Sequence, residues 1–197
     1  MKLVLATRNP HKLREFGPLL EPHRVLALPE EVVLPPETGT TFEENALIKA
    51  RAAAAATGRV AIADDSGIAA AALGGRPGVR SARYAGENAS DEENLDKLLR
   101  EVPDDGDRRV AYVCVLAYVD PAGTTHVVEG RCEGTLAHDP RGDGGFGYDP
   151  AFVPADRDDG RTMAELTPDE KDAISHRGRA ARALVTWLAE NGAGAER

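Results

Sequence analysis

The chain has 197 residues, 42% of them hydrophobic, and a formal net charge of -9. This hydrophobic content is enough for a sizeable core and excludes wholesale disorder, and the length fits a single domain. The acidic balance argues against a general nucleic-acid or anionic-membrane surface, because such surfaces need a basic field. It is compatible with a small anionic substrate in a local basic pocket. No apolar run approaches the length of a membrane span and the first residues show no signal-peptide pattern, so we expect a cytoplasmic protein.

The first predicted strand covers residues 2–6 and leads into a polar loop, T-R-N-P-H-K at residues 7–12. A helical pattern of apolar positions follows over residues 13–20. A loop between a first strand and a helix N-terminus suits phosphate, because free backbone N–H groups and the helix dipole face the anion. Lys12 can reach back from the first helical turn. The loop lacks the Walker glycine and lysine pattern, so a solvated turn with an Asn-Pro helix start is also compatible with it.

A second strand is predicted at residues 25–28 and a longer helix at residues 42–57. Thr41 and Glu44 form a capping box at the start of this helix. Gly58 follows its last turn, where a glycine commonly ends a helix.

Residues 60–63 form a short apolar run that predicts a buried strand ending at Asp64-Asp65-Ser66-Gly67. Two adjacent buried carboxylates must be paired, protonated or bound to a metal, which suggests a divalent cation at this strand end. Adjacent residues on an extended segment point to opposite faces, so both could face one metal only if the chain turned there. We therefore expect unequal roles for the two. Lys49, which shares a helix face with Asn45, could bind phosphate nearby, although a solvated lysine is the commoner case.

The C-terminal half begins with a predicted helix at residues 91–100, behind the capping box Ser90-Asp91-Glu92-Glu93. Two long strand-like runs, residues 110–119 and 125–136, flank a D-P-A-G turn and predict a β-hairpin. Cys114 and Cys132 lie one in each run. We expect both to be buried reduced thiols rather than a disulfide or a metal site.

A glycine-rich loop, G-G-F-G-Y-D-P, occupies residues 144–150. It would let the backbone approach a ligand and offer a ring for stacking, although a tight loop around a core phenylalanine has the same pattern. A capping box at residues 167–170 predicts a helix with Lys171 one turn in. Residues 175–179 open a last helix that ends at Asn191-Gly192, and the tail, residues 193–197, is expected to fray.

Six blocks of the chain, in unbroken order, resemble one known family. They are Thr7-x-Asn9-x-x-Lys12, Thr41-Phe42-x-Glu44-Asn45-Ala46-x-x-Lys49-Ala50, Ala63-Asp64-Asp65-Ser66-Gly67, Pro77-Gly78-x-x-Ser81-Ala82-Arg83-Tyr84, Gly144 to Pro150, and Ser175-His176-Arg177. Together they are similar to the inosine triphosphatase family, the HAM1/RdgB-like house-cleaning pyrophosphatases for non-standard purine nucleotides. The departures are small: Val110 and Tyr112 stand where relatives often carry Ala and Phe, and Tyr148 where some carry Trp.

The resemblance implies an α/β fold with an elongated mixed sheet flanked by helices, in two lobes with the substrate cleft between them. Residues 1–197 would form a single pyrophosphatase domain, and a homodimer would be the usual assembly. The implied reaction is Mg²⁺-dependent hydrolysis of inosine, deoxyinosine or xanthosine triphosphate to the monophosphate and pyrophosphate.

The resemblance also implies roles for particular residues. Asp65 would be the catalytic base and a Mg²⁺ ligand, with Glu37 as the second ligand, and the role of Asp64 stays open. The substrate-binding residues would be Thr7, Arg8, Asn9, His11, Lys12, Lys49, Ser66, Phe146, Gly147, Tyr148, Asp149, Lys171, His176 and Arg177. Within this set Lys12 and Lys49 would bind the triphosphate.

Purine recognition would fall to the residues near the C-terminus. Phe146 would stack on the base, and Asp149, His176 and Arg177 would read its edge. A fixed donor would favour the O6 acceptor of hypoxanthine and xanthine over the amino group of adenine.

Two other interpretations are compatible with parts of the pattern. One is a Maf-like pyrophosphatase acting on pyrimidine or modified nucleotides, against which the F-G-Y-D and S-H-R blocks argue. The other is a non-catalytic nucleotide sensor, against which the intact residues Asp64, Asp65 and Glu37 argue.

Overall fold

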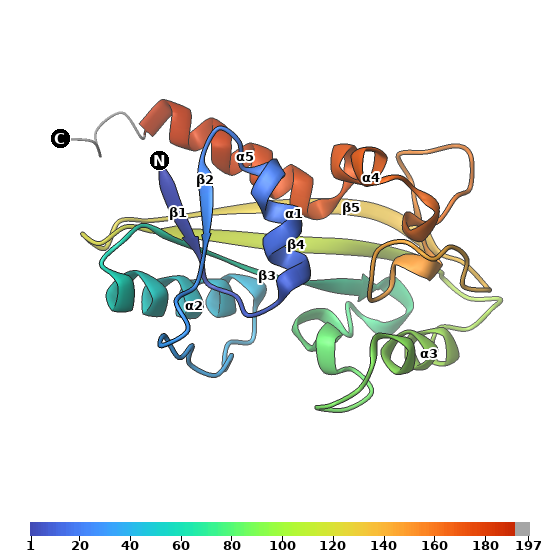
Figure 1. Cartoon of the computed structure of the whole chain (residues 1–197). Coiled ribbons are helices and arrows are strands. Elements are labelled where there is room, and N and C mark those ends of the chain that lie inside the picture. The colour runs from blue at the N-terminus through green and yellow to red at the C-terminus, as the bar shows by residue number, and fades with distance from the viewer. Residues whose placement is uncertain (192–197) are drawn as a thin grey trace. The chain divides into compact units, whose positions relative to one another are not determined.

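The computed structural model describes residues 1–191, so the predicted tail lies outside the described residues. The strands are β1 (Lys2–Leu5), β2 (Arg24–Ala27), β3 (Ala61–Ala70), β4 (Arg109–Val119), β5 (Thr125–Leu136) and β6 (Phe152–Pro154). The helices are α1 (Pro10–Leu19), α2 (Phe42–Thr57), α3 (Asp91–Glu101), α4 (Pro168–Ile174) and α5 (His176–Asn191), labelled in Figure 1. Short 3₁₀ helices are η1 (Ala71–Leu73), η2 (Gly78–Arg83), η3 (Asp149–Ala151) and η4 (Met163–Glu165).

The strands form one sheet in the order β2-β1-β3-β4-β5-β6. It is a mixed sheet, because β1 pairs in parallel with β2 and β3 whereas β5 and β6 are antiparallel. The expectation of an α/β fold with a mixed sheet is confirmed. Within the described residues no helix is both long and apolar enough to cross a membrane.

The chain divides into two compact units, and β3, β4 and β5 each contribute residues to both. The first unit contains residues 1–65, 114–130 and the described part of 177–197. The second contains residues 66–113 and 131–176.

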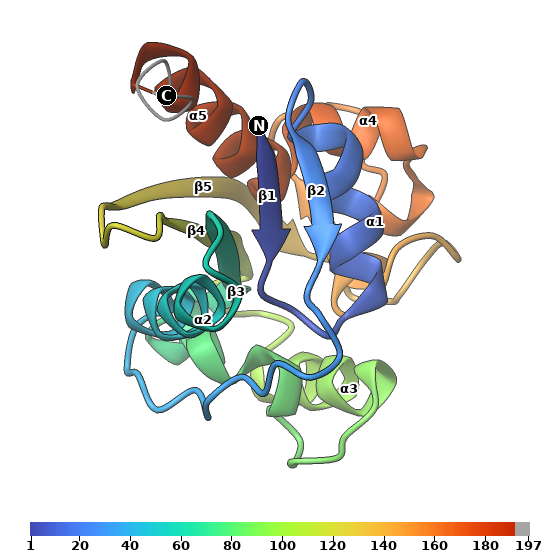
Figure 2. The same cartoon turned by 60° about the vertical axis from the view of Figure 1, so that its left-hand side comes forward.

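The first unit is built on strands whose alternate residues pack against different helices. Leu3 and Leu5 of β1 join Phe16 of α1 and Leu184 of α5 in one apolar cluster. Val4 lies in a second cluster that includes the alanines of α2. The period of two along the strand therefore sends one set of side chains toward α1 and α5 and the other set toward α2. Figure 2 shows β1 and β2 running in the same direction.

The capping boxes predicted for α2, α3 and α4 are all present. Helix α2 ends at Gly58, which adopts the left-handed conformation with φ 61°. The turn of the hairpin is closed by the Asp120 N–H, which donates to the Thr124 carbonyl at 3.1 Å. Cys114 and Cys132 are both buried cysteines that are not joined in a disulfide, as expected.

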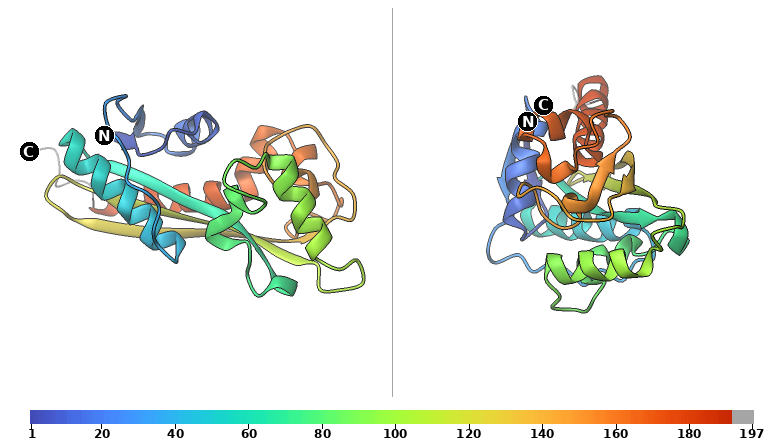
Figure 3. Two further views of the ribbon diagram at one scale, coloured as in Figure 1. Left: turned by 90° about the horizontal axis from the view of Figure 1, so that it is seen from below. Right: turned by 90° about the vertical axis from the view of Figure 1, so that its right-hand side faces the viewer.

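The second unit has its own apolar core, which includes residues of β3, α3, β4 and β5. Figure 3 shows α3 lying against the η2 segment. Gly67 belongs to this unit, and a Cβ there would come within 2.3 Å of the Ser81 hydroxyl. That hydroxyl accepts the Ile68 N–H at 2.9 Å and donates to the Gly78 carbonyl at 2.6 Å, so only glycine fits at position 67.

One expectation about β3 is wrong. The strand predicted to end at Asp64-Asp65-Ser66-Gly67 continues through these residues as β3 to Ala70. The reason is that each carboxylate meets polar partners from a neighbouring helix while the backbone stays extended. The structure therefore needs no turn at this point.

Candidate functional site

Asp64 and Asp65 lie on opposite faces of β3. Asp64 follows the parity of Ile62, whose cluster contains residues of α1 and α5. Asp65 follows the parity of Ala63, whose cluster contains residues of α2. The alternation of the strand thus assigns the two carboxylates to two different sets of partners, in agreement with the expected unequal roles.

Asp64 is enclosed by cations. The Lys12 Nζ lies 2.8 Å from its Oδ2, and the Arg177 Nε lies 3.8 Å from the same oxygen. Arg177 also donates to Glu15 at 2.8 Å. Burial by itself would raise the pKa of Asp64, but the charges of Lys12, Arg177 and Lys49 outweigh it and hold the pKa well below the usual range. Asp64 is therefore a permanently ionised carboxylate.

Asp65 has a different environment. The Asn45 amide of α2 donates to its Oδ2 at 3.0 Å. Burial, reinforced by the negative charge of Glu37, raises the pKa of Asp65 to about 6 against the opposing effects of Lys49 and Asn45. Asp65 can consequently take up and release a proton close to neutral pH, which suits a group that handles water or a metal.

Lys49 links these carboxylates. Its Nζ donates to Glu37 Oε1 at 2.5 Å and to the Asp64 backbone carbonyl at 2.7 Å. Burial lowers the pKa of Lys49, but Asp64, Asp65 and Glu37 together raise it above the usual value. Lys49 is therefore firmly charged, and Glu37 and Asp65 both lie near that charge.

The residues fit a divalent cation that arrives with a phosphate. Glu37 and Asp65 supply hard carboxylate oxygens, and the charge of Glu37 already raises the pKa of Asp65. In residues 1–191 no three or more His, Cys, Asp or Glu side chains gather as a complete metal site. A cation held by one or two carboxylates, with phosphate oxygens and water completing its shell, is the usual arrangement for Mg²⁺.

The predicted phosphate loop is organised around the start of α1. Asn9 caps the helix, its Oδ1 accepting the His11 N–H at 2.8 Å, and Thr7 accepts the Asn9 N–H at 3.1 Å. His11 is exposed, and its Nδ1 lies 2.9 Å from Arg14.

The contacts of Arg8 differ from those expected of a phosphate ligand. Its two terminal nitrogens donate to the backbone carbonyls of Leu28, Pro29, Glu30 and Val32 at 2.5 to 3.1 Å. Arg8 therefore holds the segment that follows β2, and that it binds substrate stays a prediction. Its guanidinium donors are already used on carbonyl oxygens.

A second group of predicted residues gathers around Asp149 in the second unit. The buried Asp149 carboxylate accepts the Phe146 N–H at 2.9 Å, the Lys171 Nζ at 2.9 Å and the Tyr112 hydroxyl at 3.0 Å. The Lys171 Nζ lies 5.3 Å from the centre of the Phe146 ring. Gly145 has φ 74° and a Cβ there would meet Asp149 at 2.1 Å, so its glycine is needed for the loop to close on the carboxylate.

His176 joins this group through a ring contact. Its imidazole stacks on Tyr112, with ring centres 4.6 Å apart and planes 15° apart. The Tyr148 hydroxyl donates to the Ser81 carbonyl at 2.7 Å, and burial raises the pKa of Tyr148. The Gly147 N–H donates to Asp91 at 2.8 Å.

The structure thus separates the predicted residues into two groups. Lys12, Lys49, Glu37, Asp65 and Arg177 belong to the first unit, whereas Phe146, Asp149, Lys171 and His176 belong to the second. Ser66, the first residue of the second unit, is half-buried. That these residues bind or turn over substrate stays a prediction.

Asn45, Tyr112 and Asp91 contact predicted residues but were not themselves predicted as site residues. Asn45 had a signal in the sequence, because it lies four residues before Lys49 on the same helix face. Tyr112 and Asp91 had none, since their partners are 37 and 56 residues away in the chain.

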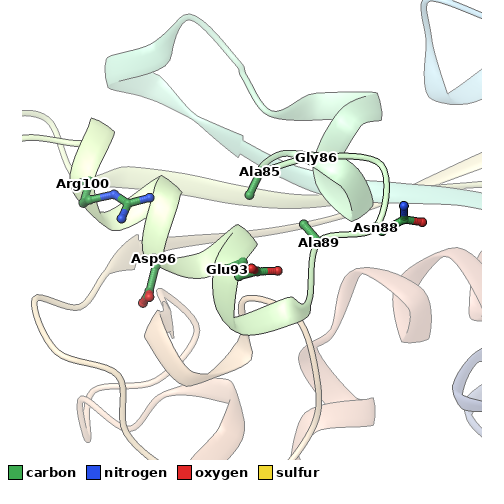
Figure 4. Close-up of a pocket in the computed structure, with 7 residues that line it drawn as sticks. All are labelled: Ala85, Gly86, Asn88, Ala89, Glu93, Asp96 and Arg100. Atoms are coloured by element: carbon green, nitrogen blue, oxygen red, sulfur yellow. The ribbon is translucent and has the colours of Figure 1, made fainter.

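The second unit also has a hollow of about 470 Å³, and the residues that line it belong to neither of these two groups. It is lined by Ala85, Gly86, Asn88, Ala89, Glu93, Asp96 and Arg100, which Figure 4 shows on α3 and the loop before it. No predicted site residue lines it. Its Glu93 carboxylate accepts the Ser90 N–H at 2.7 Å as part of the α3 capping box.

The two groups define a class: an α/β protein with carboxylates and lysines suited to a metal and phosphate, and a separate aromatic group with a buried aspartate. Comparisons with known proteins agree with this. The model of the Ham1 family matches residues 3–187. The chain therefore belongs to the Ham1 family.

Individual relatives cover nearly the whole chain. The dITP/XTP pyrophosphatase of Streptomyces coelicolor is 48% identical over an alignment that covers 96% of this chain and 98% of that protein. The dITP/XTP pyrophosphatase of Pectobacterium atrosepticum is 51% identical over 95% of this chain and 98% of its own length. The solved structure of a HAM1 protein from Coxiella burnetii is similar with a TM-score of 0.88 and 46% identity, over 96% of this chain and 99% of that one.

We predict that Lys12→Met destabilises the protein at pH 8 by about 3 kcal/mol, because it leaves the buried Asp64 carboxylate short of a partner. In an Asp64→Asn background the same change should cost much less. Urea unfolding of the four proteins of this cycle measures the coupling, with Lys2→Met, an exposed lysine on β1, as the control. Equal effects of Lys12→Met in the two backgrounds would contradict the pairing.

We predict that Asp65→Asn stabilises the metal-free protein. The folded pKa of about 6 lies above the ordinary aspartate value of 3.8, so the folded state binds more protons and stability falls as the pH rises from about 4 to about 6. At pH 8 the full loss of folding stability from ionising Asp65 is about 3 kcal/mol, and asparagine, which does not ionise, avoids this loss. Urea unfolding in EDTA should show the gain at pH 8 and its disappearance near pH 4.

The neighbouring variant Asp64→Asn is the matched control, since the pKa of Asp64 is lowered and its charge stabilises the fold above the unfolded pKa. It should destabilise at pH 8. If both variants changed stability in the same direction, the assignment of different environments to the two carboxylates would be wrong.

Proposed function

We propose that this protein is a Mg²⁺-dependent pyrophosphatase that hydrolyses non-standard purine nucleoside triphosphates, deoxyinosine, inosine and xanthosine triphosphate, to the monophosphate and pyrophosphate. The observation that carries the proposal is the placement of Asp65 and Glu37 next to the charged Lys49 in the first unit. The names of the relatives from Streptomyces coelicolor and Pectobacterium atrosepticum support the substrate class.

The first unit supplies the groups for the phosphates. Lys12 and Lys49 are point charges suited to phosphate oxygens. The α-phosphorus is attacked by water, the bond to the pyrophosphate oxygen breaks, and pyrophosphate leaves with the electron pair. With a pKa of about 6, Asp65 is mostly ionised at pH 8 and can accept the proton of the attacking water.

Glu37 and Asp65 would hold the Mg²⁺. When bound, the cation neutralises phosphate charge and acidifies water. Asp64 has a different role in the proposal, because Lys12 and Arg177 hold it ionised on the other face of β3. We assign it to positioning Lys12 and Arg177.

The second unit supplies the groups for the base. Phe146 offers a ring for stacking, with Lys171 beside it. His176 is a polar group able to read the purine edge, and the donors around Asp149 give that carboxylate a positioning role as well. A fixed donor favours O6 of hypoxanthine or xanthine over the amino group of adenine. Arg177 remains a candidate for recognising the purine edge, in addition to its pairing with Glu15.

The wider setting is also part of the proposal. We propose that the chain forms a single pyrophosphatase domain of two units and that it acts in the cytoplasm as a homodimer. The two buried thiols, which are not joined in a disulfide, are compatible with a reducing compartment, and the burial that raises the pKa of Cys114 makes this thiol unreactive. Light scattering of the purified protein tests the dimer.

We predict that pyrophosphate is released from deoxyinosine and xanthosine triphosphates with Mg²⁺, at a kcat/KM at least about a hundredfold above that for deoxyadenosine triphosphate, because unpaired polar groups discriminate strongly. A coupled pyrophosphate assay over a nucleotide panel measures this. Asp65→Asn should abolish turnover while remaining folded.

The panel separates the alternatives. Release only from pyrimidine nucleotides would indicate a Maf-like activity, and release from none would indicate a nucleotide sensor. Near-normal activity of Asp65→Asn would remove the base and metal assignment while leaving the substrate class intact.

We predict that Glu37→Gln raises the Mg²⁺ concentration needed for half-maximal activity by about tenfold or more, since even an outer-shell partner contributes that much to metal affinity. A Mg²⁺ titration at saturating deoxyinosine triphosphate measures it. Glu31→Gln is the control, because it makes the same charge change at an exposed position of the same segment. An unchanged Mg²⁺ requirement in Glu37→Gln would exclude Glu37 as a ligand.

A further inference from the structure

Tyr112 is the central member of a stack of three rings in the second unit. Phe152 lies on one side, with ring centres 4.3 Å apart and planes 17° apart. His176 lies on the other side at 4.6 Å and 15°. Tyr112 itself is buried, with 6% of its surface exposed. A ring held on both faces can neither rotate nor shift without moving its neighbours.

The hydroxyl of the same side chain fixes a carboxylate. It donates to Oδ1 of Asp149 at 3.0 Å, while the Phe146 N–H and the Lys171 Nζ both bond Oδ2. The two oxygens of Asp149 thus have different partners, and the Tyr112 hydroxyl is the partner that sets the rotation of the carboxylate plane. Because Oδ2 holds Phe146 and Lys171, this rotation decides where those two groups lie.

We propose that Tyr112 is the positioning residue of the base-recognition group: its ring orients the His176 imidazole and its hydroxyl orients Asp149, and through Asp149 it sets Phe146 and Lys171. One buried side chain therefore couples groups that come from β4, α4, η3 and α5. The proposal rests on the proposed function, because it assigns Tyr112 to purine recognition and not to phosphate chemistry. Tyr112 acts through its neighbours and does not touch the reacting atoms.

Tyr112→Phe tests the hydroxyl alone, since phenylalanine keeps the ring in the stack. We expect KM for deoxyinosine triphosphate to rise about tenfold, in line with the loss of a hydrogen bond to a charged group, with kcat within about twofold of the wild type. The preference for deoxyinosine over deoxyadenosine triphosphate should fall by a similar factor. Tyr112→Leu, which removes the ring as well, should lose more of this preference.

Tyr118→Phe is the matched control. Tyr118 is a buried tyrosine on the same strand, but it belongs to the first unit and its ring packs edge-on against Trp187 at 5.1 Å. The loss of the hydroxyl in Tyr118→Phe should leave KM and base preference unchanged.

Direct binding separates local from general damage. Titration calorimetry with a non-hydrolysable α,β-methylene analogue of deoxyinosine triphosphate should show about tenfold weaker binding to Tyr112→Phe. The affinity for pyrophosphate, which carries no base, should equal that of the wild type. Equal weakening for both ligands would mean that Tyr112 is merely structural and would overturn the proposal.

The same titration separates this proposal from the proposed function. If the wild type released no pyrophosphate but bound the analogue more tightly than Tyr112→Phe did, the pyrophosphatase function would fail and the role of Tyr112 would stand. If the wild type were active and Tyr112→Phe matched it in KM, base preference and analogue binding, the role of Tyr112 would fail alone. A wild type that bound no purine analogue would overturn both.

Discussion

The extended backbone of β3 at Asp64 and Asp65 is the constraint on which the first unit depends. A strand sends neighbouring side chains to opposite faces, so two adjacent carboxylates cannot share one environment. Asp64 meets Lys12 and Arg177, whereas Asp65 meets Asn45 and lies near Lys49 and Glu37. Burial acts on both aspartates in the same direction, but the cations reverse its effect on only one of them. One strand thereby provides a fixed charge and a titrating group at consecutive positions.

The second unit uses a buried aspartate in another way. Asp149 accepts three donors, from a loop backbone, a lysine and a tyrosine, and so organises its neighbours around a negative charge. Buried charges are tolerated when they are fully hydrogen-bonded, and they then hold their partners in one geometry. Gly145 is part of the same arrangement, because any larger residue would collide with the carboxylate that the loop encloses.

Local patterns in the sequence were sufficient for the helices and for most of the strands. The capping boxes at Thr41, Ser90 and Thr167 predicted helix starts correctly because each is completed within four residues. The end of β3 was predicted too early, at the Asp64-Asp65 pair, because the partners of Asp64 lie at positions 12 and 177. The cost of burying charge was recognised, but its compensation by distant side chains was not visible.

The same distinction applies to the candidate site. The blocks that resemble a family identified Lys12, Lys49 and Asp65 by residue type and order. They did not show that Arg8 would donate to the backbone carbonyls after β2. An arginine in this loop looks the same in the sequence whether it binds phosphate or anchors a neighbouring segment. Tyr112 was visible only as a departure from Phe in relatives. What its hydroxyl does depends on Asp149, a residue that the sequence places 37 positions away.

The charge balance of the first unit explains why a metal belongs in the proposed reaction. Lys12, Lys49 and Arg177 are cations that could receive a triphosphate, but each already faces a carboxylate. A triphosphate with up to four negative charges would therefore compete with these carboxylates for the same cations. A divalent cation held by Glu37 and Asp65, as we propose, would relieve that competition, since it would neutralise carboxylates and phosphate together and leave the lysines to the phosphate. Burial, together with the negative charge of Glu37, raises the pKa of Asp65, and a group that is hard to ionise without a cation gains most from binding one.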